Sequence, residues 1–274
     1  MPYFDHDDIR FRYLDIGSGI PFIFQHGLGA DVKQIKDIFE PPTGFRMVTF
    51  DCRGHGETKP LGPEDKISLA TSADDMLALF EHLGIRQAVV GGISMGAAIA
   101  LRFALNHSQR CLGLVQVRPA WLNGPLEQSI RGPFAEVATY IRRFGVAEGR
   151  AKFPETDVYR EMQKVSQDCA DSLLRQFDHP RAAETVVKLE RIPADCPTQS
   201  LEEVRQVQTP TLVLANHHDP IHPFEYGETL AKTFPNARLH EITSKSTDID
   251  QHQADVQKHV EEFLKTLLGS EGND

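Results

Sequence analysis

A serine flanked by glycines at residues 92–96 (GISMG) has the type and spacing that suit nucleophilic chemistry. The apolar run before it, residues 88–90, is typical of a buried strand, and the Ala- and Leu-rich stretch 97–105 favours a helix. A strand, a sharp turn and a helix in this order hold a serine hydroxyl clear of the backbone and near the first N–H groups of the helix. We therefore expect Ser94 to act as a nucleophile at a site that stabilises developing negative charge.

Polar motifs follow three other predicted strands. His26-Gly27 follows the apolar segment 21–25, the turn 51–56 (DCRGHG) follows 45–50, and Asp219 comes shortly after 211–215. Ligands of open parallel sheets bind beyond the carboxyl ends of the strands. The motifs are therefore expected to converge with Ser94 on one crevice.

The elements that must position these residues alternate between strand and helix. Further strands are predicted at 9–14, 111–117 and 238–242, and helices at 31–39, 68–83, 224–234 and 255–268. This alternation predicts an α/β protein with a mostly parallel sheet that helices cover on both faces.

The alternation stops between residues 119 and 207. This segment is charged, poor in strand patterns and repeatedly interrupted by proline. It is expected to form short helices inserted into the α/β core, as a lid that controls access to the crevice.

Taken together, these motifs resemble the α/β-hydrolase family. The resemblance covers residues 1–118 and 208–274 as the core, with 119–207 in the place of the family's helical cap. It implies that Ser94 is the nucleophile and Asp219 the acid of a catalytic triad. It also implies an oxyanion hole made by the backbone N–H groups of Leu28 and Met95, and a reaction that needs no metal or cofactor.

The histidine of the triad departs from the family pattern. The family places Gly-His in the loop after the last strand, but no glycine occurs between Gly227 and Gly269, and the corresponding place near Ser246 holds no histidine. His252 lies between the last predicted strand and helix and is the candidate base by elimination, with a structural or solvent-facing role as its rival. His222 is too close in sequence to Asp219 to be its usual partner. It is expected to line the substrate pocket, together with His26, Gly27 and Trp121.

These residues favour a serine hydrolase that acts on a small ester, lactone or related carbonyl substrate through an acyl-enzyme. A carbon–carbon bond hydrolase or an enol-lactonase would use the same groups. Because the usual Gly-His is absent, a ligand-binding or regulatory relative with little or no turnover also remains open. A dehalogenase would need aspartate at position 94 and is set aside.

Composition narrows the classes of partner. The chain has 274 residues, a formal net charge of −10, and no concentrated basic face, which argues against nucleic acid and anionic membranes. It has neither the pattern of a signal peptide nor a membrane-spanning apolar run, so we expect a cytoplasmic protein with a small-molecule substrate. The four cysteines show no C-x-x-C spacing and are expected to be reduced thiols. The sequence leaves a homodimer open, and residues 269–274 are expected to be disordered.

Overall fold

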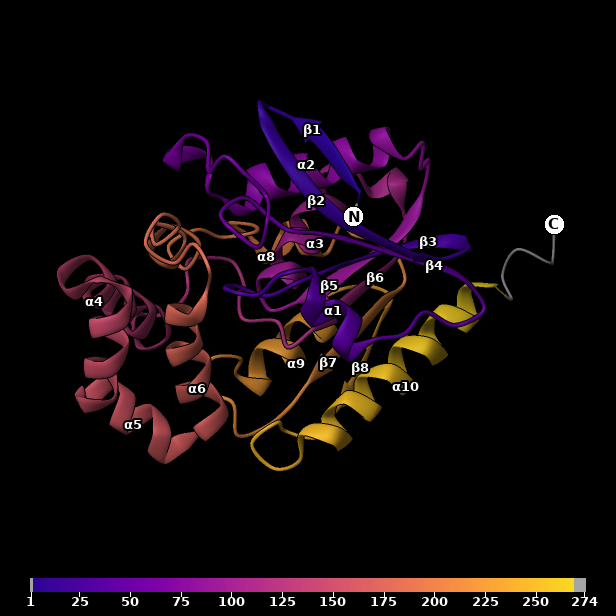
Figure 1. Ribbon diagram of the computed structural model, residues 1–274. Coiled ribbons are helices and arrows are strands. Elements are labelled where there is room, and N and C mark those ends of the chain that lie inside the picture. The colour runs from indigo at the N-terminus through magenta and orange to yellow at the C-terminus, as the bar shows by residue number, and fades with distance from the viewer. Residues whose placement is uncertain (1, 269–274) are drawn as a thin grey trace.

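A computed structural model describes residues 2–268, which form one eight-stranded sheet at the centre of the molecule (Figure 1). The strands run in the order β1-β2-β4-β3-β5-β6-β7-β8. β1 and β2 are antiparallel to their neighbours, and the strands from β4 to β8 are parallel. The predicted mostly parallel α/β sheet is therefore confirmed. The strands are β1 (Tyr3–His6), β2 (Ile9–Gly17), β3 (Gly19–Gln25), β4 (Gly44–Phe50), β5 (Ala88–Ile93), β6 (Cys111–Val117), β7 (Thr211–Ala215) and β8 (Ala237–Glu241).

Helices cover both faces of the sheet (Figure 1). α2 (Leu69–His82), α3 (Met95–Asn106) and α9 (Phe224–Thr233) contribute to one apolar core, whereas α1 (Val32–Ile38) and α10 (Ile249–Leu268) contribute to the other. Alternate residues of each strand point to opposite faces. In β4, for example, Val48 packs in the first core and Met47 in the second. The alternation of strands and helices thus places two apolar layers around a sheet whose strand ends are left for the site.

The segment between β6 and β7 is helical, and residues 118–210 contribute no strand. It lies to one side of the sheet in Figure 1. The predicted insertion of a helical cap is confirmed, while its treatment as a separate domain with boundaries at 119 and 207 stays a prediction. Its helices are α4 (Gln128–Lys152), α5 (Asp157–Val165), α6 (Gln167–Arg175), α7 (Lys188–Arg191) and α8 (Leu201–Val204). Short 3₁₀ helices occur at η1 (Glu64–Lys66), η2 (Ser108–Arg110), η3 (Phe153–Glu155) and η4 (Gln176–Asp178).

Polar contacts join the cap to the turn after β4. The buried Lys188 Nζ donates to Gly54 O at 2.9 Å and to Thr185 Oγ1 at 2.7 Å. His179 Nε2 accepts from Gly56 N at 3.3 Å. Burial lowers the pKa of Lys188 to about 7. The cap therefore rests on backbone groups of the core through side chains whose protonation is shifted by burial.

The last helix begins earlier than predicted. α10 starts at Ile249 rather than at 255, so the connection from β8 is short. The expectation of disorder for residues 269–274 lies outside the described residues. Among residues 2–268, none of the helices combines the length and apolar character needed to cross a bilayer.

Candidate active site

Ser94 is the single residue that joins β5 to α3, and it has φ 55° and ψ −112°. A positive φ is uncommon for a residue other than glycine and marks a strained turn. The two flanking glycines are required by close approach. A Cβ on Gly96 would lie 2.1 Å from Gln25 O, and a Cβ on Gly92 would lie 2.3 Å from the carbonyl carbon of Gly96. The sharp turn predicted from the GISMG spacing is confirmed.

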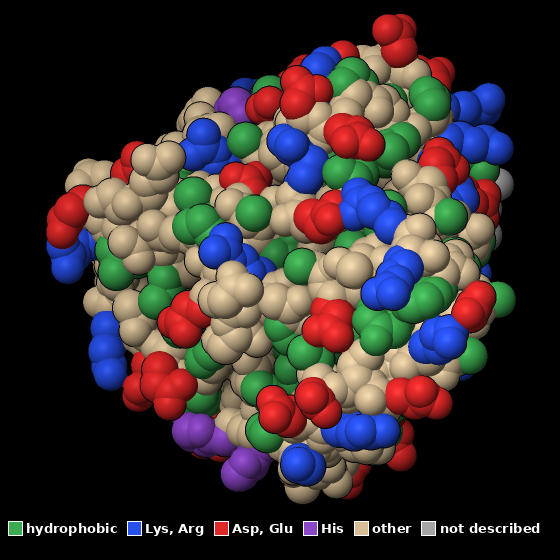
Figure 2. Space-filling model, turned by 90° about the vertical axis from the view of Figure 1, so that its left-hand side faces the viewer, with side chains coloured by type: hydrophobic (Ala, Val, Ile, Leu, Met, Phe, Trp, Pro, Cys, Tyr) green, Lys and Arg blue, Asp and Glu red, His purple; other side chains and the backbone are tan. Residues whose placement is uncertain are grey.

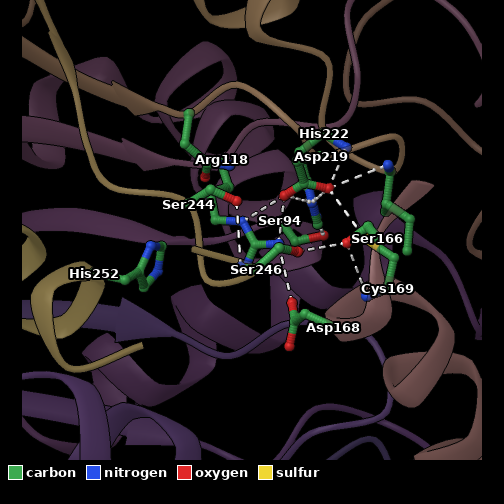
Figure 3. Close-up of polar contacts among 12 residues, drawn as sticks. Ser94, Arg118, Ser166, Asp168, Cys169, Asp219, His222, Ser244, Ser246 and His252 are labelled. Carbon is green, nitrogen blue, oxygen red and sulfur yellow. Dashed lines mark hydrogen bonds and ion pairs between the residues drawn. The ribbon is translucent and has the colours of Figure 1, made fainter. Parts of the chain in front are cut away.

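The imidazole that contacts Ser94 belongs to His222, which lies in the loop between β7 and α9 (Figure 3). Its Nε2 is 2.8 Å from Ser94 Oγ, and its Nδ1 is 2.9 Å from Asp219 Oδ2 and 3.0 Å from Oδ1. An ionised carboxylate only accepts hydrogen bonds, so Nδ1 carries the hydrogen and Nε2 keeps a lone pair. The Ser94 hydroxyl then donates to that lone pair, as nucleophilic attack by its oxygen requires.

A tight turn lets an acid and an imidazole three residues apart face each other. Asp219 Oδ1 accepts the backbone N–H groups of Ile221 and His222, each at 3.1 Å. Aspartate commonly closes turns in this way, and Pro220 in the sequence favours the turn. The turn carries the chain back, so that the imidazole of His222 lies against the carboxylate of its own loop.

His252 does not reach Ser94, and the predicted placement of its imidazole there is wrong. It lies in the first turn of α10, is fully buried, and is set apart from the Ser94 cluster in Figure 3. Its Nδ1 donates to Thr243 O at 2.7 Å, while Nε2 is buried and has no partner within residues 2–268. Burial, followed by the charge of Arg118, lowers its pKa to about 4. The early start of α10 is the physical reason, because the helix holds the side chain in the core.

Arg118 is a further member of the cluster that the sequence did not reveal. It follows β6 directly with φ 49°, and its backbone N–H donates to Leu214 O at 2.7 Å. Its Nε donates to Asp219 Oδ2 at 2.9 Å, and its Nη2 also donates to this oxygen. Asp168 of the cap lies 3.8 Å from the same guanidinium. The acid therefore shares its charge between an imidazole and a buried arginine.

These contacts set the protonation of the acid and the imidazole. Burial alone would raise the pKa of Asp219, but Arg118 and then His222 outweigh it and hold the pKa well below its usual value. The pKa of His222 is lowered, because burial lowers it against the opposing charge of Asp219 and Arg118 lowers it further. At neutral pH the site therefore combines an ionised acid with a neutral imidazole, the state in which a general base works.

The loop after β3 supplies the other wall of the site. Gly27 and Leu28 line the cavity in front of Ser94, and a Cβ on Gly27 would lie 3.7 Å from Ser94 Cβ. Met95 is the first residue of α3, so no carbonyl of the same helix accepts its N–H. Leu28 thus lines the cavity and Met95 directly follows Ser94, and their role as donors to an oxyanion stays a prediction.

Two predicted pocket residues lie behind the cavity wall instead. His26 is fully buried: its Nδ1 donates to Gly27 O at 2.9 Å and its Nε2 accepts from Cys52 N at 3.1 Å. Trp121 packs in the apolar core and donates Nε1–H to Asp195 O at 3.0 Å. Gly27 and His222 line the cavity, whereas the predicted residues His26 and Trp121 are not part of its lining.

The turn after β4 braces this loop. Asp51 Oδ1 accepts Val32 N and its Oδ2 accepts Glu57 N, both at 2.8 Å. Arg53 forms a bidentate ion pair with Asp75, with both distances 2.7 Å. These charged groups are buried and paired.

The cavity in front of Ser94 has a volume of about 450 Å³, a size suited to a small molecule. Core and cap both contribute to it. Within residues 2–268, no group of three His, Cys, Asp or Glu side chains is arranged to hold a metal ion. The lining residues include Gly27, Leu28, Asp31, Ser94, Arg118, Phe134, Asp168, Cys169, Ser172, Arg175, His179, Ile221, His222 and Lys245.

Comparison with protein families agrees with this architecture. A family model described as alpha/beta hydrolase fold matches residues 20–139, and one described as TAP-like protein matches residues 179–270. The non-heme haloperoxidase of Rhodococcus erythropolis is 29% identical and covers 87% of this chain and 90% of that protein. The 2-hydroxy-6-oxononadienedioate/2-hydroxy-6-oxononatrienedioate hydrolase 2 of Pseudomonas putida is 25% identical, with coverages of 85% and 83%.

Solved structures share the fold over nearly the whole chain. A thermophilic esterase from Thermogutta terrifontis superposes with a TM-score of 0.73 at 24% identity, covering 94% of each chain. The enol-lactonase from Burkholderia xenovorans LB400 gives a TM-score of 0.72 at 23% identity, covering 96% of this chain and 100% of that one. At these identities the likeness shows the fold.

Proposed function

Because the chain belongs to the α/β-hydrolase family, we propose that it is a serine hydrolase with Ser94, His222 and Asp219 as its catalytic triad. Its substrate is a small ester, lactone or related carbonyl compound. The observation that carries the proposal is the 2.8 Å contact between Ser94 Oγ and His222 Nε2. The other ring nitrogen of His222, Nδ1, contacts Asp219.

The proposed reaction follows from these contacts. His222 Nε2 takes the proton of the Ser94 hydroxyl as the oxygen attacks the carbonyl carbon, and Asp219 stabilises the imidazolium that forms. The N–H groups of Leu28 and Met95 hold the negative oxygen of the tetrahedral intermediate. The imidazolium then protonates the leaving group, and the same base activates the water that releases the acyl group from Ser94.

The contact also bears on the alternative of a ligand-binding relative. That alternative was motivated by the missing Gly-His after the last strand, and an imidazole from another loop now stands beside Ser94. A carbon–carbon bond hydrolase or enol-lactonase would employ the same groups, so a lactone panel belongs beside the ester panel. A cytoplasmic location and a homodimer stay predictions.

A fluorophosphonate probe tests the nucleophile. We expect the wild type and Ser172→Ala to be labelled and Ser94→Ala to be unlabelled, since Ser172 is a second serine lining the same cavity. The labelled peptide should contain residue 94. Labelling that persists in Ser94→Ala, or that maps to Ser172, would show that the proposed nucleophile is wrong.

A further inference from the structure

Lys245 is one of the cationic residues of the active-site cavity. It lies in the segment between β8 and α10, is half-buried, and lines the same cavity as Ser94 and His222. Within residues 2–268 its ammonium group makes no hydrogen bond or ion pair. Burying a charge is costly unless it is paired, so a bound anion that paired with this ammonium group would be stabilised there.

The neighbouring charges are already paired with one another. Arg118 is bound to Asp219, and Arg175 Nη2 lies 3.4 Å from Asp168 Oδ1. Together with Lys245 these groups amount to three positive and two negative charges. The four neighbours are the charges that act most strongly on Lys245. The excess of one positive charge is therefore local to this end of the cavity.

The cavity lining also includes Asp31 and Asp178, and neither of these carboxylates is among the charges that act most strongly on Lys245. Over the cap end of the molecule, Lys and Arg side chains are interspersed with Asp and Glu, and no broad patch of one sign is visible (Figure 2). With a formal net charge of −10, the chain as a whole repels anions. The positive excess is thus a property of the cavity rather than of the surface.

Lys245 lines the same cavity as Ser94 and His222, and its charge is one of those that lower the pKa of His222. A carboxylate on the ammonium would therefore belong to a molecule short enough to place its carbonyl at Ser94 within a cavity of about 450 Å³. We propose that Lys245 is a specificity-determining residue that binds a substrate carboxylate, so that the natural substrate is an ester or lactone of a compound carrying an acid group. This inference rests on the proposed function.

Turnover of matched pairs of esters tests the proposed binding of a carboxylate by Lys245. 4-Nitrophenyl hemiglutarate against 4-nitrophenyl pentanoate places the charge on the acyl side, and 3-carboxyphenyl butyrate against phenyl butyrate places it on the alcohol side. We expect the wild type to prefer the charged member of one pair in kcat/KM. Because a hydrogen bond to a charged group is strong, Lys245→Met should reduce that preference about 10- to 100-fold. The ratio within a pair cancels any change in the basicity of His222.

Two control variants distinguish a direct contact between Lys245 and the substrate from an effect of the protein's net charge. Lys245→Arg keeps the positive charge and should retain most of the preference. Lys164→Met removes one positive charge from an exposed position on α5 and should leave the preference unchanged. Equal preference for both members of both pairs, or a preference that survives Lys245→Met, would overturn the inference while leaving the serine hydrolase proposal intact.

Binding measurements on a variant without turnover test the inference independently. In Ser94→Ala, calorimetry should show monomethyl glutarate binding at least tenfold tighter than methyl pentanoate, and Ser94→Ala/Lys245→Met should lose the difference. If this difference is present while the wild type cleaves no ester or lactone, the anion site stands and the hydrolase proposal fails. Equal binding of the two compounds to Ser94→Ala overturns the anion site.

Discussion

Replacing Arg118 by methionine should move the pH dependence of the reaction to higher pH. Arg118 lowers the pKa of His222. Its removal also leaves Asp219 with a single cationic partner, the imidazolium formed during catalysis. Both effects raise the pKa of His222. Since the reaction needs the neutral imidazole, the rate rises as pH passes through this pKa, and the midpoint of the rise must move upward in Arg118→Met.

The same substitution should destabilise the fold by a moderate amount. Arg118 makes two hydrogen bonds to a buried carboxylate, and hydrogen bonds to charged groups contribute about 1.5–3 kcal/mol each. Asp219 still accepts the N–H groups of Ile221 and His222 and keeps its contact with the imidazole, so its charge is not left without partners. We therefore expect a loss of about 3–5 kcal/mol, or about 6–20 °C in Tm for a chain of this size.

The assay is kcat/KM for a small neutral ester from pH 5 to pH 9, with the concentration of active sites titrated for each variant. Arg175→Met is the matched control, because Arg175 lines the same cavity but contacts Asp168 rather than Asp219. Its midpoint should stay near that of the wild type. A midpoint for Arg118→Met that is unchanged, or lower than that of the wild type, would refute the argument that Arg118 acts on the imidazole through their shared acid.

Two further substitutions test the turn at Ser94 and the contact that Lys188 makes between the cap and the core. Gly96→Ala should prevent correct folding, since the new Cβ would lie 2.1 Å from Gln25 O. The control Gly124→Ala should keep the wild-type Tm, because its new Cβ meets nothing within 4 Å. A Gly96→Ala protein with an unchanged Tm would contradict this. For Lys188, burial lowers the folded pKa from 10.5 to about 7, so the unfolded chain binds more protons between these values. The free energy of unfolding in urea should therefore increase for the wild type, relative to Lys188→Met, by up to about 1.4 kcal/mol per pH unit as pH rises from 7 to 9.5. A difference in unfolding free energy that stays constant over this range would contradict the pKa shift.

The parts of the site that depend on local pattern were predictable from the sequence. The GISMG spacing predicts the turn at Ser94, because bulk at either glycine meets backbone atoms. The polar motifs after β3, β5 and β7 meet at the cavity because the strands are parallel and their carboxyl ends share one edge of the sheet, whereas no residue of the turn 51–56 lines the cavity. Asp219 lies where that argument placed it.

The position of the imidazole was not predictable from the family pattern. That pattern favours a histidine after β8, and His252 satisfied it only if the chain stayed in a loop as far as residue 252. The helix α10 instead begins at Ile249, and its first turn directs His252 into the core. The sequence signal for His222 was local: Asp219-Pro220 favours a turn, and a turn can bring side chains three residues apart together. Arg118 and Lys245 depend on contacts between distant segments, which periodicity does not report.

In the proposed mechanism His222, and not His252, is the base that activates Ser94. Asparagine at either position keeps a donor in the place of Nδ1 but offers no Nε2 base, so the same substitution can be made at both sites. For ester hydrolysis at pH 7.5, kcat/KM should fall at least about 10³-fold in His222→Asn, because triad members act as a unit. His252→Asn should stay within a few-fold of the wild type. Near-wild-type turnover in His222→Asn, or a comparable loss in His252→Asn with an unchanged Tm, would contradict the assignment.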